Sequence, residues 1–171
     1  MAANNALNSC SSTSAAGSQE QWRVLMQEAL KEAGKARSRG EVPVGAVLAD
    51  AGTGEILAGG SNRCIELNDP TAHAEIIALR RAGQARGNYR LPGTVLAVTL
   101  EPCLMCLGAI AQARIDGLVY GPRDPGAGAL FSRPDILDFV WLSHKFWIVE
   151  NILKDECLEL LQNFFRDKRS P

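Results

Sequence analysis

The stretch Thr99-Leu100-Glu101-Pro102-Cys103-Leu104-Met105-Cys106 constrains this chain more than any other. An apolar run from Thr94 to Leu100 predicts a strand, and a helix-like run that begins with Cys103 and Cys106 follows it. At this spacing both thiols are expected on one face of the first helical turn. Helix N-termini lower thiol pKa values, so these cysteines favour the thiolate, the form that binds metal. The stretch therefore predicts half of a tetrahedral zinc site.

The composition is that of a folded chain with its own core. The 171 residues are 46% hydrophobic and 22% charged, which predicts one domain, residues 18–171. Residues 1–17 are low in complexity and have almost no apolar periodicity, which predicts a disordered leader. No apolar run approaches the roughly 20 residues of a membrane span, and the N-terminus lacks the features of a secretory signal. A formal net charge of −1 gives no overall attraction to nucleic acid, so any RNA-binding surface must be local.

The cysteine content points to the same kind of site. The chain has five cysteines, an odd number, and two of them form the Cys-x-x-Cys pattern. In a cytoplasmic protein, where we expect this chain to act, that pattern indicates metal or redox chemistry rather than a disulfide framework.

Predicted strands and helices mostly alternate along the chain after one hairpin. The predicted helices are 19 to about 37, 72 to about 83 with Thr71 as N-cap, 103 to about 114, 134 to about 141 and 152–166. The predicted strands are 42–49, 55–60, 94–100, 118–121 and 146–149, with loops at 61–70 and 122–133. This order predicts an α/β fold, a three-layer α/β/α sandwich around a mixed five-stranded sheet. Gly45, Gly59 and Gly60 mark bulges or places where another element approaches the backbone.

His73 and Glu75 complete the predicted metal chemistry. They lie at the start of a predicted helix, after a polar loop. One imidazole with the thiolates of Cys103 and Cys106 gives zinc three protein ligands, and the open fourth position is typical of a catalytic site. Zinc lowers the pKa of a coordinated water toward about 7. Glu75, which is not needed as a ligand, can then move the proton to a substrate's ring nitrogen and leaving amine.

The motif His73-Ala74-Glu75 with Pro102-Cys103-Leu104-Met105-Cys106 matches the H-x-E…P-C-x-x-C signature of the zinc nucleobase deaminases. Beyond that signature, the chain from about Gln19 to Arg169 resembles the bacterial tRNA-specific adenosine deaminases. The further segments that carry the resemblance are Glu41–Val47, Asn62-Arg63, Asp69–Ala72, Asn88–Leu91, Gly121–Asp124, Asp155–Cys157 and Phe164–Arg166.

The resemblance implies a cytidine deaminase-like fold and the conversion of the wobble adenosine of an arginine tRNA anticodon to inosine. It assigns one zinc per subunit to His73, Cys103 and Cys106, and the proton shuttle to Glu75. It also implies a homodimer whose tRNA groove is built from both subunits. The residues that it assigns to substrate binding are Asn62, Val44, Ala74, Asp124, Phe165 and Arg166.

The sequence also fits two other functions. A guanine deaminase of the same superfamily would share the zinc motif and similar flanking residues. A non-catalytic subunit that keeps zinc for stability and binds RNA is the other alternative. The presence of Glu75 counts against that alternative, because a structural zinc site has no use for this carboxylate.

Overall fold

The computed structural model describes residues 19–132 and 144–169. Within them, five strands form one mixed sheet in the order β2-β1-β3-β4-β5. The strands are β1 (Gly45–Asp50), β2 (Ile56–Ser61), β3 (Thr94–Val98), β4 (Gly117–Tyr120) and β5 (Trp147–Val149). β1 pairs antiparallel with β2 and β3, whereas β3, β4 and β5 are parallel. The predicted mixed five-stranded sheet is confirmed.

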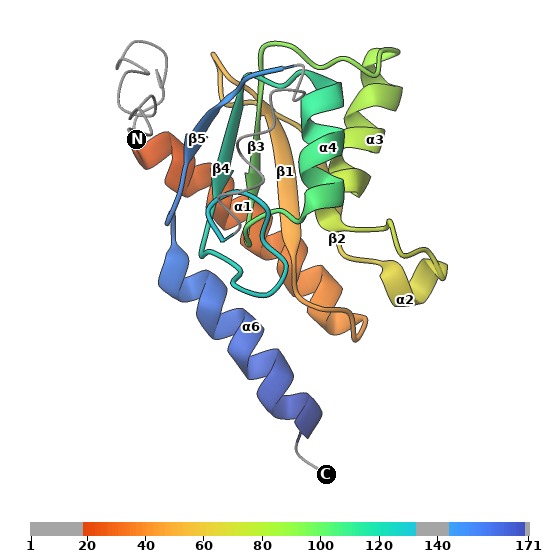
Figure 1. Ribbon diagram of the computed structural model, residues 1–171, viewed down its shortest axis with the longest axis vertical. Coiled ribbons are helices and arrows are strands. Elements are labelled where there is room, and N and C mark those ends of the chain that lie inside the picture. Colours follow the sequence, from red (N-terminus) through yellow and green to blue (C-terminus); the bar gives the residue numbers. More distant parts are fainter. Residues whose placement is uncertain (1–18, 133–143, 170–171) are drawn as a thin grey trace, which may run out of the picture.

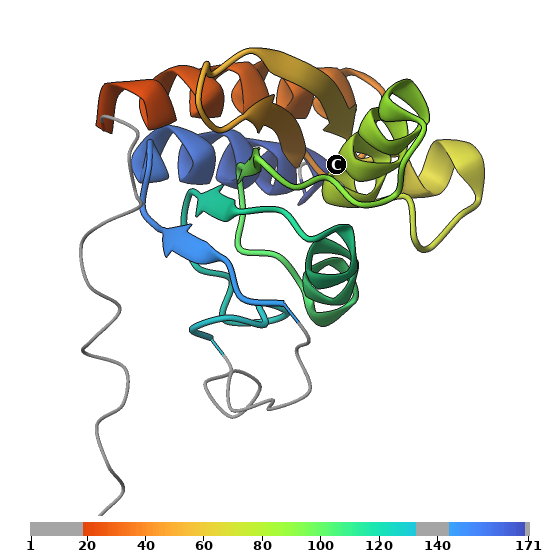
Figure 2. The ribbon, with the colours of Figure 1, turned by 90° about the horizontal axis from the view of Figure 1, so that it is seen from above.

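Helices cover both faces of the sheet (Figure 1, Figure 2). The four long helices are α1 (Gln19–Ser38), α3 (Ala74–Arg86), α4 (Leu104–Ala113) and α6 (Lys154–Arg169). Apolar side chains of α1 and α6 form a core with one face, and those of α3 and α4 form a second core with the other. The three layers agree with the predicted α/β/α sandwich, because each helix and each sheet face must bury its apolar side.

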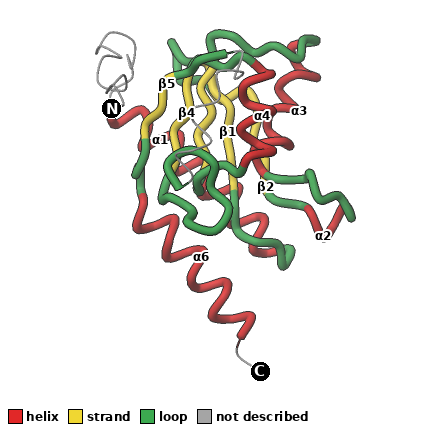
Figure 3. Tube along the Cα trace, viewed as in Figure 1, coloured by secondary structure: helices red, strands yellow, loops and turns green. Residues whose placement is uncertain are grey.

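α3 and α4 run side by side and begin at the same end of the sheet (Figure 1). α4 follows β3 and leads back to the parallel β4, so its N-terminus lies where β3 ends. The irregular segment after β4, drawn among the green loops of Figure 3, lies at this end too. The fold thus places two helix N-termini and one long loop at one edge of the sheet.

Several predicted boundaries were wrong. The predicted loop 61–70 contains the short helix α2 (Cys64–Leu67). The helix predicted from residue 72 begins at Ala74, with His73 as its N-cap. Thr71 does not cap it, because the Thr71 N–H and hydroxyl donate to Asp69 at 2.8 and 2.7 Å. This turn keeps residues 71–73 out of the helix.

Other boundaries moved by only a few residues. β1 begins at Gly45, three residues after the predicted start. α3 continues to Arg86, and the following residue, Gly87, adopts the left-handed conformation that ends the helix. The leader, residues 1–17, and the helix predicted from 134 lie outside the described residues. In the part of the chain that the structure describes, no helix is both long and apolar enough to cross a membrane.

Two strand glycines allow helices to lie directly on the sheet, as their positions predicted. A Cβ atom at Gly45 would overlap the backbone of α1 at Ala29 and Ala33. A Cβ atom at Gly60 would overlap the backbone of α3 at Ala74 and Ala78. The absent side chains therefore fix how closely α1 and α3 pack, and through α3 they fix the position of the residues at its start.

We expect Gly45→Ala to lower the free energy of unfolding by about 2 kcal/mol or more, because backbone atoms cannot move aside for the added methyl group. Gly34→Ala is the matched control, since Gly34 is an exposed residue of α1 with open space around its Cβ position. That change should stabilise the chain by about 0.5–1 kcal/mol through helix propensity. Urea unfolding measures both; equal stability of the two variants would contradict the close packing.

Candidate metal centre

His73, Cys103 and Cys106 form the one group of potential metal ligands found among the described residues. Their ligand atoms all lie within 4.8 Å of one another. His73 is the N-cap of α3 and Cys103 is the N-cap of α4, both in extended backbone conformation. Cys106 lies in the first turn of α4. The prediction that both thiols belong to the first helical turn is therefore wrong for Cys103, which precedes it.

The N-cap position explains why these thiols meet. Residues three apart at a helix start are neighbours on its surface, and in α4 the N-cap Cys103 and the third helical residue Cys106 have this spacing. The Cys103 carbonyl accepts the first intrahelical hydrogen bond, from Leu107 N–H at 2.9 Å. In α3 the His73 carbonyl does the same for Ile77 N–H at 3.0 Å. The two helix starts are equivalent, and each presents a ligand toward the other.

The geometry of the three atoms fits zinc. His73 Nδ1 lies 3.6 Å from Cys103 Sγ and 3.5 Å from Cys106 Sγ. Zinc bonds of about 2.3 Å to sulfur and about 2.1 Å to nitrogen, at tetrahedral angles, place sulfur and nitrogen about 3.6 Å apart. Two thiols and one imidazole are also the soft and borderline donors that zinc prefers.

Close contacts couple the protonation of the three side chains. A hydrogen bond from Cys106 lowers the pKa of the Cys103 thiol to about 4, although burial opposes it. The same bond, with burial, raises the pKa of Cys106, and the contact with Cys103 raises the pKa of His73. A divalent cation at the centre would stabilise both thiolates and the neutral imidazole.

Glu75 lies beside this group and is almost fully buried, with 3% of its surface exposed. It belongs to the first turn of α3, and its carboxyl group is close enough to the Cys106 thiol to affect the pKa of both groups. Burial raises the pKa of the carboxyl group, because a charge is poorly stabilised away from water. The carboxyl group therefore contacts the metal-ligating side chains without being one of the three.

A cavity of about 190 Å³ opens onto the group. Six of the residues expected at the site line it: Val44, Asn62, His73, Glu75, Cys103 and Asp124. Asp124 Oδ1 accepts the N–H groups of Gly126 and Ala127 at 2.9 and 3.2 Å, so this carboxylate also shapes its own loop. Ala74 is fully buried at the start of α3. Phe165 and Arg166 lie on α6 and are not among the lining residues, so their place in an RNA groove stays a prediction.

Four further lining residues were not predicted: Val42, Leu100, Glu101 and Ala127. Glu101 had a detectable signal in the sequence. It stands between an apolar strand and Cys103, where a carboxylate is costly to bury unless hydrogen bonds compensate for it. The other three carry no chemical signal, since Val, Leu and Ala occur throughout the core.

Comparison with known proteins agrees with this site. The sequence profile of the cytidine and deoxycytidylate deaminase zinc-binding region matches residues 19–122. A tRNA-specific adenosine deaminase of Haemophilus influenzae is 46% identical over 145 residues, 85% of this chain and 83% of the relative. The enzyme of the same name from Agrobacterium fabrum is also 46% identical over 145 residues, and the match covers 94% of it.

Solved structures show the same fold. One, from a study of A-to-I editing by tRNA:A34 deaminases at the wobble position of transfer RNA, is 45% identical with a TM-score of 0.77. That match covers 81% of this chain and 99% of the other. A guanine deaminase from Nitrosomonas europaea is 21% identical with a TM-score of 0.68, over 86% of this chain and 84% of the other, and at this identity it shares the fold alone.

We expect purified protein to contain about one zinc ion per chain and Cys106→Ala to contain almost none, because two protein ligands hold zinc poorly. A chelator should lower the Tm of the wild-type chain, since it removes a ligand that binds the folded state. Cys64→Ala is the matched control, because Cys64 lies outside the ligand group. Elemental analysis checks the zinc content, and full zinc in Cys106→Ala would disprove the assignment.

Proposed function

Because this chain belongs to the cytidine and deoxycytidylate deaminase zinc-binding family, we propose that it converts the wobble adenosine in the anticodon of an arginine tRNA to inosine. The observation that carries this proposal is the 46% identity, over most of the chain, to relatives named tRNA-specific adenosine deaminase. The choice of an arginine tRNA rests on the resemblance of the sequence motifs. The reaction replaces the amino group by oxygen from water and releases ammonia.

His73, Cys103 and Cys106 would hold the zinc ion, as their tetrahedral spacing supports. When bound, zinc supplies a Lewis acid that makes water nucleophilic at neutral pH. Three protein ligands would leave zinc one further coordination position, which a water can take. His73 and Cys103, which would hold the ion, both line the cavity, and their attachment to two helix starts fixes their side chains there.

Glu75 is proposed as the proton shuttle. Glu75 lines the same cavity as His73 and Cys103, which supports this role, because a water and a base bound there would both lie near its carboxyl group. It would accept a proton from water and deliver protons to the ring nitrogen and the leaving amine. Burial among apolar groups keeps bulk water away from this transfer.

The other lining residues would hold the nucleoside. Asn62 would hydrogen-bond the flipped nucleoside, the Ala74 N–H would face the edge of the base, and Val44 would pack against the ring. Asp124 would contact the ribose or backbone of the anticodon, where it can sense the 2′-hydroxyl group. The common cavity of Val44, Asn62 and Asp124 supports these roles. On α6, Phe165 and Arg166 would form the end of the RNA groove.

We also propose that the chain forms a homodimer through α3 and α4. Leu104 and Met105 of α4 are 50% and 37% exposed, which is unusual for apolar side chains. A mostly apolar groove of about 700 Å³ between the two helices contains Met105 and Ala109, and none of the metal-ligating side chains. A second copy would cover this surface and bring its own residues close to the start of α4.

We further propose that the protein acts in the cytoplasm, since its proposed substrate is a tRNA.

We expect the purified zinc-loaded chain to form inosine in an anticodon stem-loop of arginine tRNA and to release no ammonia from guanine. Nucleoside analysis of the RNA and an ammonia assay measure the two activities. The reverse result would show a guanine deaminase. RNA binding without inosine formation would show a non-catalytic subunit.

Glu75→Gln is the matched variant for this assay. The amide is isosteric but cannot accept and deliver protons, so kcat should fall by about 10²–10⁴-fold while zinc content and RNA affinity stay unchanged. If Glu75→Gln keeps wild-type kcat, the shuttle is a different group.

Gly108→Glu should convert the dimer to a monomer. Gly108 is exposed on α4, one turn after Leu104, and its Cβ position has open space, so the monomer can accept the new side chain. The added charge would be buried at a dimer contact, which costs several kcal/mol. Gly34→Glu on α1 is the matched control. Light scattering should give twice the chain mass for wild type and Gly34→Glu; a dimeric Gly108→Glu would place the contact elsewhere.

A further inference from the structure

Three irregular segments complete the cavity. The chain before β1 contributes Val42 and Val44, and the chain after β2 contributes Asn62. The loop after β4 contributes Asp124 and Ala127. Irregular backbone has no ladder of hydrogen bonds to hold it, so its N–H groups need other partners when they are buried. Two buried carboxylates supply part of these partners: Glu101 binds the loop with Asp124, and Glu41 binds the start of α2, which follows Asn62. Glu101 and Glu41 are 3% and 1% exposed.

Glu101 binds the loop that contains Asp124 at five points. Its Oε1 accepts the N–H groups of Leu130, Phe131 and Ser132 at 2.9, 2.9 and 3.1 Å. Its Oε2 accepts Asp124 N–H at 2.8 Å and the Ser132 hydroxyl at 2.6 Å. Both oxygens are in use, and the donors come from both ends of the segment 124–132. The loop is therefore folded around this one carboxylate.

The same loop is joined to the metal centre. Gly128 forms an isolated bridge with Cys103, and Ala129 N–H donates to the Pro102 carbonyl at 3.0 Å. A Cβ atom at Gly128 would overlap the Glu101 carboxyl group, so the backbone of the loop lies directly on the carboxylate. A shift of the loop would therefore move Asp124 and the backbone of Cys103 together.

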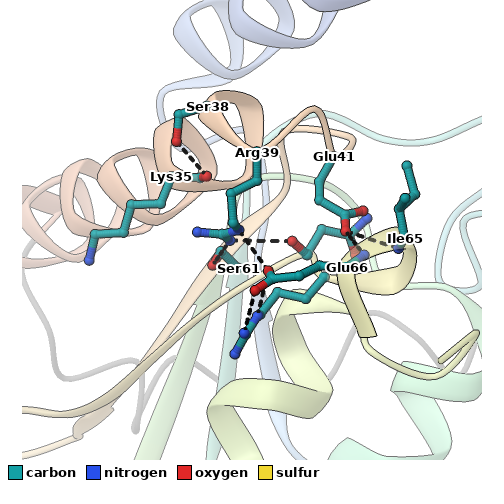
Figure 4. Close-up of polar contacts among 9 residues, drawn as sticks. Lys35, Ser38, Arg39, Glu41, Ser61, Ile65 and Glu66 are labelled. Atoms are coloured by element: carbon teal, nitrogen blue, oxygen red, sulfur yellow. Dashed lines mark hydrogen bonds and ion pairs between the residues drawn. The ribbon is translucent and has the colours of Figure 1, made fainter. Parts of the chain in front are cut away.

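Glu41 holds the segment that follows Asn62 (Figure 4). Its Oε1 accepts the N–H groups of Ile65 and Glu66 at 2.9 Å each. Arg39 reinforces the same segment, because it donates to the Ser61 hydroxyl at 2.7 Å and pairs with Glu66 at 3.1 Å. Asn62 lies between these anchors, and its own N–H donates to the Val44 carbonyl at 3.0 Å.

We propose that Glu101 and Glu41 are positioning residues of the cavity: Glu101 sets the place of Asp124 and Ala127, and Glu41 sets the place of Asn62. Neither is needed as a metal ligand or as the proton shuttle. This inference rests on the proposed function, since Asp124 and Asn62 are the residues that would hold the nucleoside. It adds that the substrate-binding wall is held by carboxylate-to-backbone hydrogen bonds and not by apolar packing alone.

Substitution by glutamine should disrupt the hydrogen bonds of Glu101 more than those of Glu41. Glu101 uses both oxygens as acceptors, so in Glu101→Gln the new NH₂ group faces N–H or O–H donors and several bonds are lost. Glu41 uses a single oxygen for both bonds, so Glu41→Gln keeps the acceptor and Glu41→Ala removes it. Glu55→Gln, on the exposed hairpin, is the control for the loss of one charge.

The test measures amide hydrogen exchange, zinc content, KM and kcat on zinc-loaded chains with the anticodon stem-loop. In Glu101→Gln, the amides of Asp124 and residues 130–132 should exchange at least tenfold faster, and KM should rise at least tenfold with zinc retained and kcat changed less. Glu41→Ala should have the same effects at Ile65 and Glu66, and Glu41→Gln should restore values near wild type. Glu55→Gln should match wild type.

Unchanged exchange at these amides, or an unchanged KM despite faster exchange, would overturn the proposal. If Glu101→Gln does not fold, Ser132→Ala removes only one of the five donors, and it should speed exchange of the same amides and raise KM by a smaller factor. A wild-type chain that forms no inosine would refute the proposed function. The exchange rates would still decide whether the carboxylates hold the two segments.

Discussion

The meeting of His73 with Cys103 and Cys106 is the constraint on which the rest of this structure depends. Three side chains from segments 30 residues apart must bring their ligand atoms within 4.8 Å of one another. This is possible only because α3 and α4 begin at the same end of the sheet and lie side by side. Gly60 contributes, since its missing side chain allows α3 to pack on β2 at its first turn. A small change in how α3 lies would move His73 away from the thiols.

Three buried carboxyl groups, those of Glu41, Glu75 and Glu101, lie around the cavity, and they differ in their hydrogen-bond partners. Glu101 and Glu41 are surrounded by backbone N–H donors, which compensate for the cost of burying a charge. Glu75 is buried to the same degree, but it lies beside the metal-ligating side chains, and burial raises its pKa. The raised pKa of Glu75 agrees with the proposed shuttle, which has to bind and release a proton near neutral pH, whereas Glu101 and Glu41 accept fixed N–H groups.

Much of the site could be predicted from the sequence, because its chemistry depends on a few residue types at fixed spacing. The spacing of Cys103 and Cys106, with His73 and Glu75 at another helix start, indicated the ligand set. Asn62, Val44 and Asp124 came from resemblance, and they line the same cavity. Glu101 and Glu41 were missed as anchors, because a carboxylate's donors are backbone N–H groups from distant segments, and backbone groups leave no trace in a residue pattern. The predicted start of α3 was wrong because the Thr71 N–H and hydroxyl donate to the Asp69 side chain, so Thr71 does not cap the helix.

By itself the sequence determined the ligand types, the apolar periods of the helices and strands, and hence a layered α/β fold around a zinc centre. Those features follow from local chemistry and from repeats of two or 3.6 residues. Only the tertiary structure decided that His73 and Cys103, at the starts of two helices, would lie together, that α2 would form within a predicted loop, and that Glu101 and Glu41 would accept N–H groups of the segments around the cavity. These outcomes depend on contacts between segments far apart in the chain, and such contacts are decided by packing, not by local sequence.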